Sequence, residues 1–399
     1  MSDEGAFSED FVYMRGRRLD CLVFDADNHM YETTDALTAH IPKEYEGIIK
    51  YVDINGRTKV AIKDQISDYI PNPTFNKVAS PGRNADPSLK KAIPSVQAFF
   101  DPEPRLTLMM DMGIDKTVLW PTLASVLEER LWDDPRATQV VVHALNEWMY
   151  EHWSYNYFDA IYSTPIISLS IMDQAIEELQ RVAERGAKAF LLRVAPVPTW
   201  EGRKSFALPE FDPFWELVQE LDITVGMHSG DPGYQRYTNE WEGFGDLEFR
   251  PFARPGTAGF QFLASEKSPI IDAMASVIGH GLASRFPRLR FTPTEFGTDW
   301  VRPFVRKLRR ASENASVLFD EDPLAVFERN VWVHAFQEQD PADLATYVPV
   351  DRITFGSDFP HPEGLADPLA WSEKLGTFSK EDQAKIMGTN VAEAMGIAV

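Results

Sequence analysis

The fold of this chain is most constrained by four short polar clusters, each at the end of an apolar run. They occupy residues 25–29 (Asp-Ala-Asp-Asn-His), 227–231 (Met-His-Ser-Gly-Asp), 294–297 (Thr-Glu-Phe-Gly) and 356–361 (Gly-Ser-Asp-Phe-Pro-His). The carboxyl ends of parallel strands meet on one side of an α/β barrel, so polar residues there come together from distant parts of the chain. Histidine, aspartate and glutamate are metal ligands. The pattern predicts a metal site at the mouth of a parallel barrel.

Apolar strand-like runs alternate with amphipathic helical stretches along most of the chain. We expect strands at 21–26, 116–120, 165–170, 189–194, 223–227, 289–292, 331–334 and 353–355. Helices are expected at 138–155, 173–185, 213–221, 270–286, 300–315 and 341–347, with a final amphipathic helix or helix pair over 380–399. Eight alternating strands without an internal repeat favour an α/β fold of the distorted TIM (β/α)8 barrel type over an open, doubly wound sheet.

Two long segments interrupt this alternation and predict insertions after the first and fifth strands. Residues 31–105 are polar and rich in Pro, Asn and Asp, whereas residues 230–267 carry eight aromatic side chains. These are Tyr234, Tyr237, Trp241, Phe244, Phe249, Phe252, Phe260 and Phe262. Such an aromatic loop can form a substrate wall, a subunit interface or a small core that fixes the insertion. We expect residues 1–399 to form one barrel domain.

Composition limits the partners and the compartment. The formal net charge of −22 would repel phosphate backbones, which argues against nucleic acid. The single cysteine, Cys21, excludes an internal disulfide and fits a reducing compartment, so a cytoplasmic location is expected. Residues 1–18 lack the order of a signal peptide, and no apolar run approaches the ~20 residues that span a bilayer. A small-molecule substrate and a homodimer are the expected partners.

Four residues at strand ends are the strongest metal-ligand candidates. Asp27 and His29 are two apart on one strand, so their side chains point to the same side and can hold one cation. Alone, such a pair is more often a turn cap with a satisfied histidine. His228 ends the fifth strand, and Asp358 follows the eighth, where it could instead be the N-cap of the next helix. Together the four favour a metal site.

These residues carry a resemblance to the amidohydrolase superfamily. The motifs at 24–29, 227–228, 294–297, 356–360 and 388–392 resemble its amidohydrolase-2 branch, which also contains aminocarboxymuconate semialdehyde decarboxylase and the resorcylate-type decarboxylases. The resemblance covers almost the entire chain and implies a TIM barrel. It also implies that Asp27, His29, His228 and Asp358 bind a divalent metal.

The chain departs from that branch at two positions. Asp27 stands where the branch usually has His or Glu, and Glu295 stands where the sixth strand usually offers His. More oxygen ligands favour iron or manganese, with zinc still competent, and Glu295 could help to hold a second ion. Asp25 and Glu32 could be extra ligands or partners of the histidines. For Asp25 the alternative is a strand-end hydrogen bond, and for Glu32 it is a solvated helix start.

Three further residues could serve the chemistry. Arg193 ends the fourth strand and could grip a substrate carboxylate or neutralise the surplus of site carboxylates. His361 could shuttle protons or cap a turn. Trp120 could line the pocket, although tryptophan at such a place is more often core.

The leading functional hypothesis is a metal-dependent hydrolase. A metal lowers the pKa of bound water, and Asp358 or Glu295 would accept its proton during cleavage of an amide, ester, lactone or thioester of a small, apolar or aromatic substrate. The alternative is a non-oxidative decarboxylase of an aromatic or enol carboxylate, with a protein acid protonating the carbon that loses CO2. Glu295 in place of histidine weakens that alternative, because an ionised carboxylate is a poorer proton donor. A barrel that only binds a ligand would be expected to have lost its metal ligands. In this chain competent residues stand at all the expected ligand positions.

Overall fold

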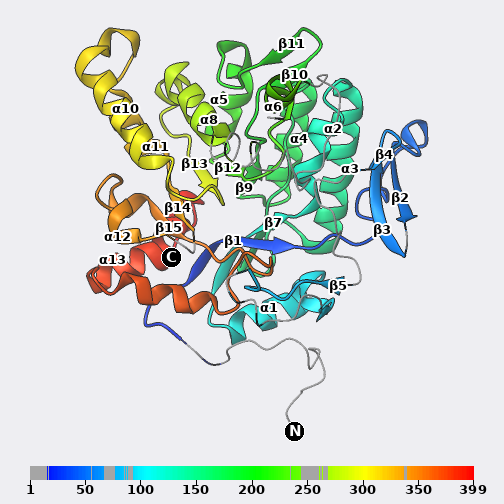
Figure 1. Cartoon of the computed structure of the whole chain (residues 1–399), viewed down its shortest axis with the longest axis horizontal. Helices are drawn as coiled ribbons and strands as arrows, with labels where there is room; N and C mark the ends of the chain where they lie inside the picture. The colour runs from blue at the N-terminus through cyan, green and yellow to red at the C-terminus, as the bar shows by residue number, and fades with distance from the viewer. Residues whose placement is uncertain are drawn as a thin grey trace.

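The computed structural model describes residues 16, 18–54, 56–66, 77–84, 86, 88, 93–233, 235–243, 260, 263, 268–336 and 339–399. Parallel strands lie in the middle of the molecule, and most of the helices lie around them (Figure 1). In this described part of the chain, no helix has both the length and the apolar character needed to cross a membrane. The α/β class expected from the sequence is confirmed.

The described residues form eight parallel strands, and the four polar clusters lie in or directly after four of them. They are β1 (Phe24–Met30), β7 (Lys116–Pro121), β8 (Ile161–Ser163), β9 (Ala189–Leu191), β12 (Thr224–His228), β13 (Phe291–Thr294), β14 (Val333–Ala335) and β15 (Ile353–Phe355). They pair in the orders β1-β7-β8, β13-β12-β9 and β14-β15. Isolated parallel bridges join Ile166 to Leu191, Phe291 to Val331 and Asn28 to Phe359. The described strands do not form one closed sheet, so barrel closure stays a prediction.

Helices occur at every place where the sequence predicts one. The described α-helices are α1 (Pro102–Asp111), α2 (Leu127–Arg130), α3 (Pro135–Trp153), α4 (Met172–Glu184), α5 (Asp212–Glu220), α6 (Gln235–Glu242), α8 (Ser268–Gly279), α9 (Leu282–Arg285), α10 (Val301–Asn314), α11 (Pro323–Asn330), α12 (Pro341–Leu344), α13 (Lys380–Ala384) and α14 (Asn390–Ala394). The helix predicted over 270–286 divides into α8 and α9 at Gly281, whose φ of 70° is left-handed. A π-helical turn at Lys385–Thr389 separates α13 from α14.

The segment 31–105 contains strands that the sequence interpretation missed. An antiparallel sheet of β2 (Ile49–Ile54), β3 (Arg57–Ile62) and β4 (Gln65–Ile66) stands at the right edge of Figure 1. Two further antiparallel pairs are β5 (Lys77–Val78) with β6 (Ile93–Pro94), and β10 (Val197–Thr199) with β11 (Gly202–Lys204). Most of the predicted aromatic loop, including Tyr234, Phe244, Phe249, Phe252 and Phe262, lies outside the described residues.

The first strand lies three to four residues later than predicted. Strand β1 runs from Phe24 to Met30 and all seven of its residues are buried, so the polar cluster belongs to the strand itself. Hydrophobicity alone ends the strand at Ala26, because the next residues are polar. Parallel pairing with β7 continues nevertheless to Met30, across a register shift between Asp25 and Asn28.

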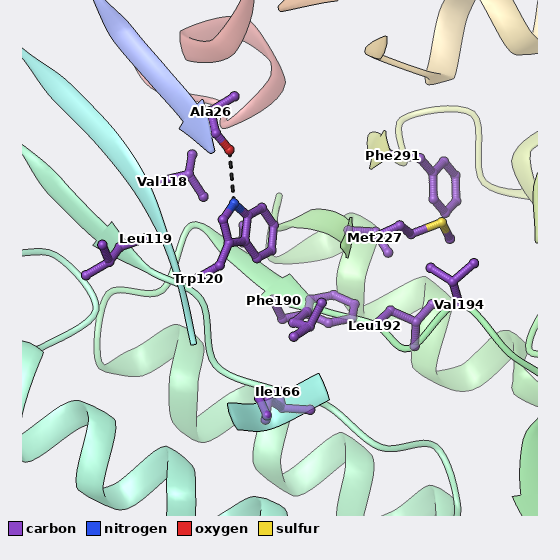
Figure 2. Packing of buried hydrophobic residues seen from close by; sticks show 14 of the residues in the cluster. Ala26, Val118, Leu119, Trp120, Ile166, Phe190, Leu192, Val194, Met227 and Phe291 are labelled. Atoms are coloured by element: carbon purple, nitrogen blue, oxygen red, sulfur yellow. Dashed lines mark hydrogen bonds between the residues drawn. The ribbon is translucent and has the colours of Figure 1, made fainter. Parts of the chain in front are cut away.

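Trp120 and Gly226 set the distance between β7 and β12 in the core. The Trp120 indole N–H donates to the Ala26 carbonyl oxygen at 3.0 Å, and its ring lies near Phe190 and Met227 (Figure 2). A Cβ added to Gly226 would lie 2.3 Å from the Trp120 ring. Glycine is therefore required here for close packing. The Trp120 ring lies 5.2 Å from the His228 ring, so this contact supports the carboxyl end of β12.

Candidate metal centre

The centre begins with two side chains of β1. Asp27 and His29 are both at most 2% exposed, and the His29 Nε2 atom lies 3.4 Å from the Asp27 Oδ1 atom. Backbone bonds join this strand to the segment after β15, since the His29 N–H donates to the Phe359 carbonyl oxygen at 2.7 Å. The Asp358 N–H donates to the Asp27 carbonyl oxygen at 2.7 Å. The first and the last of the four polar clusters are thus in direct contact.

Strands β12 and β13 add an imidazole and a carboxylate. His228 Nε2 lies 3.3 Å from Asp27 Oδ1 and 3.4 Å from Glu295 Oε2. The His228 Nδ1 atom lies 2.9 Å from its neighbour's carbonyl oxygen, that of Ser229, which favours the tautomer with the proton on Nδ1 and Nε2 facing the carboxylates. Glu295, with a φ of 61°, follows β13 in the left-handed region, which is uncommon for a residue with a side chain.

The segment after β15 brings in Asp358 and His361. Asp358 is fully buried, and its Oδ1 atom lies 3.4 Å from His29 Nε2 and 2.8 Å from His361 Nδ1. Its φ of 54° is also left-handed. The His361 ring stacks on the His29 ring with centroids 3.9 Å apart, and its Nε2 atom lies 3.1 Å from the Thr122 hydroxyl. Both rings are therefore fixed beside the carboxylate.

Several buried polar atoms of the centre lack a hydrogen-bond partner. They include Asp27 Oδ2, His29 Nδ1 and Nε2, both Asp358 carboxylate oxygens and His361 Nδ1. The 2.8 Å contact between Asp358 Oδ1 and His361 Nδ1 is close but does not have hydrogen-bond geometry. Buried polar groups are normally satisfied, so a group of orphans on metal-ligand side chains fits a cation that would bind them. Asp27, His29 and His228 can place one ligand atom each within 4.8 Å of one another, and so can His29, Asp358 and His361. The chemistry of this donor set fits a divalent metal.

The ionisable groups shift each other's pKa. Burial would raise the pKa of Asp27, but hydrogen bonds with His228 and His29 outweigh burial and hold it well below its usual range. Burial lowers the pKa of His29 to about 4. For His228, burial is outweighed by the Asp27 hydrogen bond and the Glu295 charge, which raise its pKa to about 9. Burial, followed by the charges of Glu295 and Asp27, raises the pKa of Asp358 well above its ordinary value.

Two residues of the centre were missed by the sequence interpretation. His334, on β14, has its Nδ1 atom 3.6 Å from Asp27 Oδ2 and accepts the Glu295 backbone N–H at 3.1 Å. A histidine near the end of the seventh expected strand was a signal equal to that of His228. Arg105, on α1, is buried and donates to the His29 carbonyl oxygen at 2.8 Å and to the Asn28 side chain. Nothing local in the sequence marks it.

Asp25 and Glu32 are both fully buried near the centre. The Asp25 carboxylate accepts the Ser357 N–H at 2.8 Å and the Asn28 side-chain amide at 3.0 Å, which is the expected hydrogen-bonding role at a strand. Glu32 accepts the Leu123 N–H at 2.7 Å and therefore ties the segment after β1 to the one after β7. The alternative of a solvated helix start for Glu32 is wrong, because its exposure is 0%.

Trp120 lies beside the centre, whereas the contacts of Arg193 are with other groups. The Arg193 guanidinium forms an ion pair with Glu129 and donates to the Asp231 carbonyl oxygen at 3.0 Å. Asp231 also forms an ion pair with Arg130 at 3.0 Å. Trp120 is part of the buried core, and its ring lies beside the ring of His228.

Comparisons with known proteins assign this chain to a family. The amidohydrolase-2 family model, described as Amidohydrolase, matches residues 79–397. The chain belongs to the amidohydrolase family. The resemblance seen in the motifs is thereby confirmed, and this amidohydrolase is an enzyme of a metal-dependent superfamily. No curated protein sequence matches it.

Solved structures similar to this amidohydrolase come from several bacteria. An amidohydrolase from Mycobacterium avium subsp. paratuberculosis K-10 is 32% identical, with a TM-score of 0.86 over 95% of this chain and 100% of that one. A dihydroxybenzoic acid decarboxylase from Polaromonas sp. JS666, with bound manganese and the inhibitor 2-nitroresorcinol, is 16% identical, with a TM-score of 0.58 over 94% and 97%. A 5-carboxyvanillate decarboxylase from Sphingomonas paucimobilis is 15% identical, with a TM-score of 0.58 over 95% and 100%. The two decarboxylases share the fold.

Proposed function

We propose that this amidohydrolase is a metal-dependent, non-oxidative decarboxylase of a small aromatic or enol carboxylate. The observation that carries the proposal is the buried cluster of Asp27, His29, His228 and Asp358, with unpaired ligand atoms, in a chain whose fold is shared by decarboxylases. This reverses the order of the two hypotheses drawn from the sequence. The proposal includes closure of the parallel strands into one barrel with insertions after β1 and β12.

Asp27, His29, His228 and Asp358 would hold the metal. When bound, a divalent ion supplies a positive charge that orients a carboxylate and stabilises negative charge developing on the substrate. The set holds more carboxylate than a typical zinc site, which supports manganese or iron over zinc.

Glu295 and His361 are the proposed route for protons. Their side chains are 18% and 13% exposed, whereas Asp27 and Asp358 are fully buried, so these two groups are better placed than the two buried carboxylates to exchange protons with solvent. We assign to Glu295 the transfer of the proton that replaces CO2 on the substrate carbon, which requires this carboxylate first to take up a proton from solvent. His361, 2.8 Å from Asp358, would keep that carboxylate in place. Arg193 is the proposed grip on a substrate carboxylate, which requires the substrate to replace Glu129.

Hydrolysis is the second candidate. Glu295 Oε2 lies 3.4 Å from His228 Nε2, and a carboxylate beside a metal ligand can also accept a proton from an attacking water. The substrate would then be an amide, ester, lactone or thioester.

Release of CO2 separates the two reactions. The manganese-loaded enzyme is incubated with dihydroxybenzoates and 5-carboxyvanillate, and in parallel with aryl esters and lactones, while dissolved CO2 and released acid are measured. The decarboxylated phenol is also incubated in D2O, where a decarboxylase should exchange ring hydrogen for deuterium. CO2 release and exchange, both lost in Glu295→Ala, are the expected results. Acid release from esters without CO2 or exchange would replace decarboxylation by hydrolysis.

A further inference from the structure

Helix α10 carries a row of cations on its outward face. Its buried residues, Val301, Phe304, Val305 and Leu308, recur at three- and four-residue spacing and pack on one side of the helix. The helix lies at the upper left of Figure 1, and its other side is exposed. In a chain whose net charge is −22, residues 302–310 carry five cations and no carboxylate. All five are exposed, and they are Arg302, Arg306, Lys307, Arg309 and Arg310.

Four of these cations are unpaired within the part of the chain that the structure describes. Arg302 forms an ion pair with Asp343 on α12 at 2.7 Å, whereas the other four have no carboxylate within ion-pair distance there. Arg306 and Arg310 are four residues apart, so their side chains are neighbours on the helix surface and repel each other. An approaching anionic group would relieve this repulsion.

An apolar turn follows the cations. The 3-10 turn η5 (Ser316–Leu318) begins two residues after the end of α10, and its Val317 and Leu318 side chains are 93% and 73% exposed. Single apolar residues on a surface are ordinary, but two neighbouring ones with this exposure, beside a row of cations, offer a contact point for a partner. Covering them removes apolar surface from water, which favours association.

Acidic residues lie at the same end of α10 as this turn. Glu313 and Asp320 are exposed, and neither forms an ion pair within the described residues. The Ser312 hydroxyl donates to the Asp322 carboxylate at 2.8 Å, so the chain after η5 lies against the last turn of α10. One continuous surface, here called the α10 face, therefore has a cationic part at 302–310 and an acidic and apolar part at 313–320.

The two signs of charge on the α10 face limit what can bind it. An anionic membrane or a nucleic acid is negative throughout and would repel the acidic part. A second copy related by a two-fold axis does not, because an isologous interface pairs each part of a surface with another part of the same surface. The aliphatic stems of its long cationic side chains can also cover Val317 and Leu318. Repulsion between the two net charges is screened beyond about 8 Å at physiological ionic strength, so local contacts dominate.

We propose that the α10 face is the interface of a homodimer, in which the cations at 302–310 of each copy contact Glu313 and Asp320 of the other. The homodimer expected from the sequence thereby acquires a specific surface and a specific relative orientation, with the two α10 helices antiparallel. The reaction that the enzyme catalyses does not enter this argument.

The wild-type protein provides the first test. Sedimentation velocity over a range of concentrations should show a reversible dimer at about 0.05 M NaCl, and its dissociation constant should rise at least about tenfold at about 0.5 M NaCl, because salt screens the contacts. A monomer under all these conditions would overturn the proposal. A monomer that instead sediments with phosphatidylglycerol vesicles would assign the face to an anionic lipid surface and would equally overturn it.

Charge reversal tests the orientation. Arg306→Glu with Arg310→Glu makes the α10 face mostly acidic, and Glu313→Lys with Asp320→Lys makes it basic throughout. Each double variant alone should dimerise at least about 100-fold more weakly than wild type, since like charges then face each other. An equimolar mixture of the two should form a heterodimer with affinity near that of wild type. Variants that keep the wild-type dissociation constant, or that do not associate when mixed, would contradict the interface.

Lys43→Glu with Arg136→Glu is the matched control, because it changes the net charge as Arg306→Glu with Arg310→Glu does. Both residues are exposed, on η1 (Lys43–Tyr45) and α3, and neither has an ion pair in the described part of the chain. This control should dimerise as wild type, and circular dichroism checks the folding of every variant. Carbodiimide cross-linking of an isotopically mixed wild-type dimer should join Lys307 of one copy to Glu313 or Asp320 of the other. Cross-links confined to other surfaces would overturn the proposal even if the variants do not fold.

Discussion

Two histidines in contact with the same aspartate differ widely in pKa. His29 is lowered to about 4, mainly by burial and with a contribution from the charge of His228. His228 is raised to about 9, because Asp27 and Glu295 overcome the effect of its burial. The metal-free centre therefore holds a proton on His228 at neutral pH. A metal requires the neutral imidazole, so metal binding and proton release are linked.

We expect about one proton to leave His228 for each metal ion bound at pH 7. Above pH 9 that proton is already absent, so the contribution of His228 to proton release should fall toward zero there, and metal affinity should rise up to that pH. Isothermal titration with Mn²⁺ in two buffers of different ionisation enthalpy gives the number. His228→Gln should release about one proton fewer at pH 7. An enthalpy independent of the buffer would contradict the assigned charge state.

At the residue scale, most residues of the centre could be predicted from the sequence. The predicted ligands Asp27, His29, His228, Asp358 and Glu295 do lie beside one another, because strand ends on one side of an α/β fold must meet. The roles of these residues stay predictions. Arg105 could not be foreseen, because its position depends on how α1 packs. The left-handed backbone of Glu295 and Asp358 is likewise set by tertiary structure.

At the element scale, the packing of β7 against β12 depends on a missing side chain. Gly226 leaves the space that the Trp120 ring fills, and the same ring donates a hydrogen bond to Ala26 on β1. The indole of Trp120 therefore fixes the spacing of three strands, β1, β7 and β12. An error in this spacing would move His228 relative to Asp27.

Gly226→Ala should destabilise the protein by about 1–3 kcal/mol, the usual cost of overpacking a core. It should also weaken metal binding, because β12 carries His228. Urea unfolding and manganese titration measure the two effects. Gly279→Ala is the control, since a Cβ there would meet nothing within 4 Å. Adding Trp120→Phe, with its smaller ring, should recover part of the lost stability. Equal stability of the Gly226 and Gly279 variants would contradict the packing argument.

Glu32 links the segment after β1 to the start of the helix that follows β7, and burial raises its pKa to about 8. In the unfolded chain the pKa of Glu32 is near its ordinary value of 4.5. The folded state thus binds a proton more tightly, and Glu32 stabilises the fold below pH 4.5 and progressively less as the pH rises to 8.

Glu32→Gln should remove this dependence, because an amide does not ionise and its oxygen can still accept the Leu123 N–H. Free energies of unfolding in urea from pH 5 to 8, compared with wild type, test this. The advantage of the variant should grow as the pH increases. A constant difference between the two proteins would show that Glu32 does not titrate in this interval.

Element boundaries show where hydrophobic patterning stops being informative. Strand β15 was predicted at its observed limits, Ile353–Phe355, because its residues are apolar and buried. For β1 the prediction ended at residue 26, since the buried residues that follow are polar. The third strand was predicted at 165–170, but β8 is Ile161–Ser163, and the predicted stretch contributes only the Ile166 bridge to Leu191. The prediction for β1 was wrong because the following residues are polar. The prediction for β8 was wrong in a stretch that begins at a proline.

At the scale of the whole molecule, the proposed ligands of the metal centre belong to different sheets. Asp27 and His29 come from the β1-β7-β8 sheet, His228 from β13-β12-β9, and Asp358 from the segment after β14-β15. A bound ion would therefore connect all three sheets. The homodimer and the cytoplasmic location stay predictions.

Manganese at about 100 times its Kd should add about 2.7 kcal/mol to the free energy of unfolding, because the unfolded chain does not hold the ligands together. Thermal and urea unfolding with added Mn²⁺ or with a chelator measure this gain. Asp27→Asn should lose most of it. Asp133→Asn, whose carboxylate is 54% exposed and pairs with Lys63, should keep it. A gain equal in both variants would mean that the ion stabilises the protein from another place.

The contact of β1 with the segment after β15 also determines when β1 can reach its native surroundings during synthesis. The Ser357 N–H that binds Asp25 lies 332 residues later in the chain. At roughly 5–20 residues per second, a ribosome needs about 17 to 66 s to make the intervening chain. During that interval one edge of β1 has no native neighbour and carries two carboxylates and an imidazole without their later partners. The native surroundings of this edge of β1 therefore cannot form until residue 357 has been made.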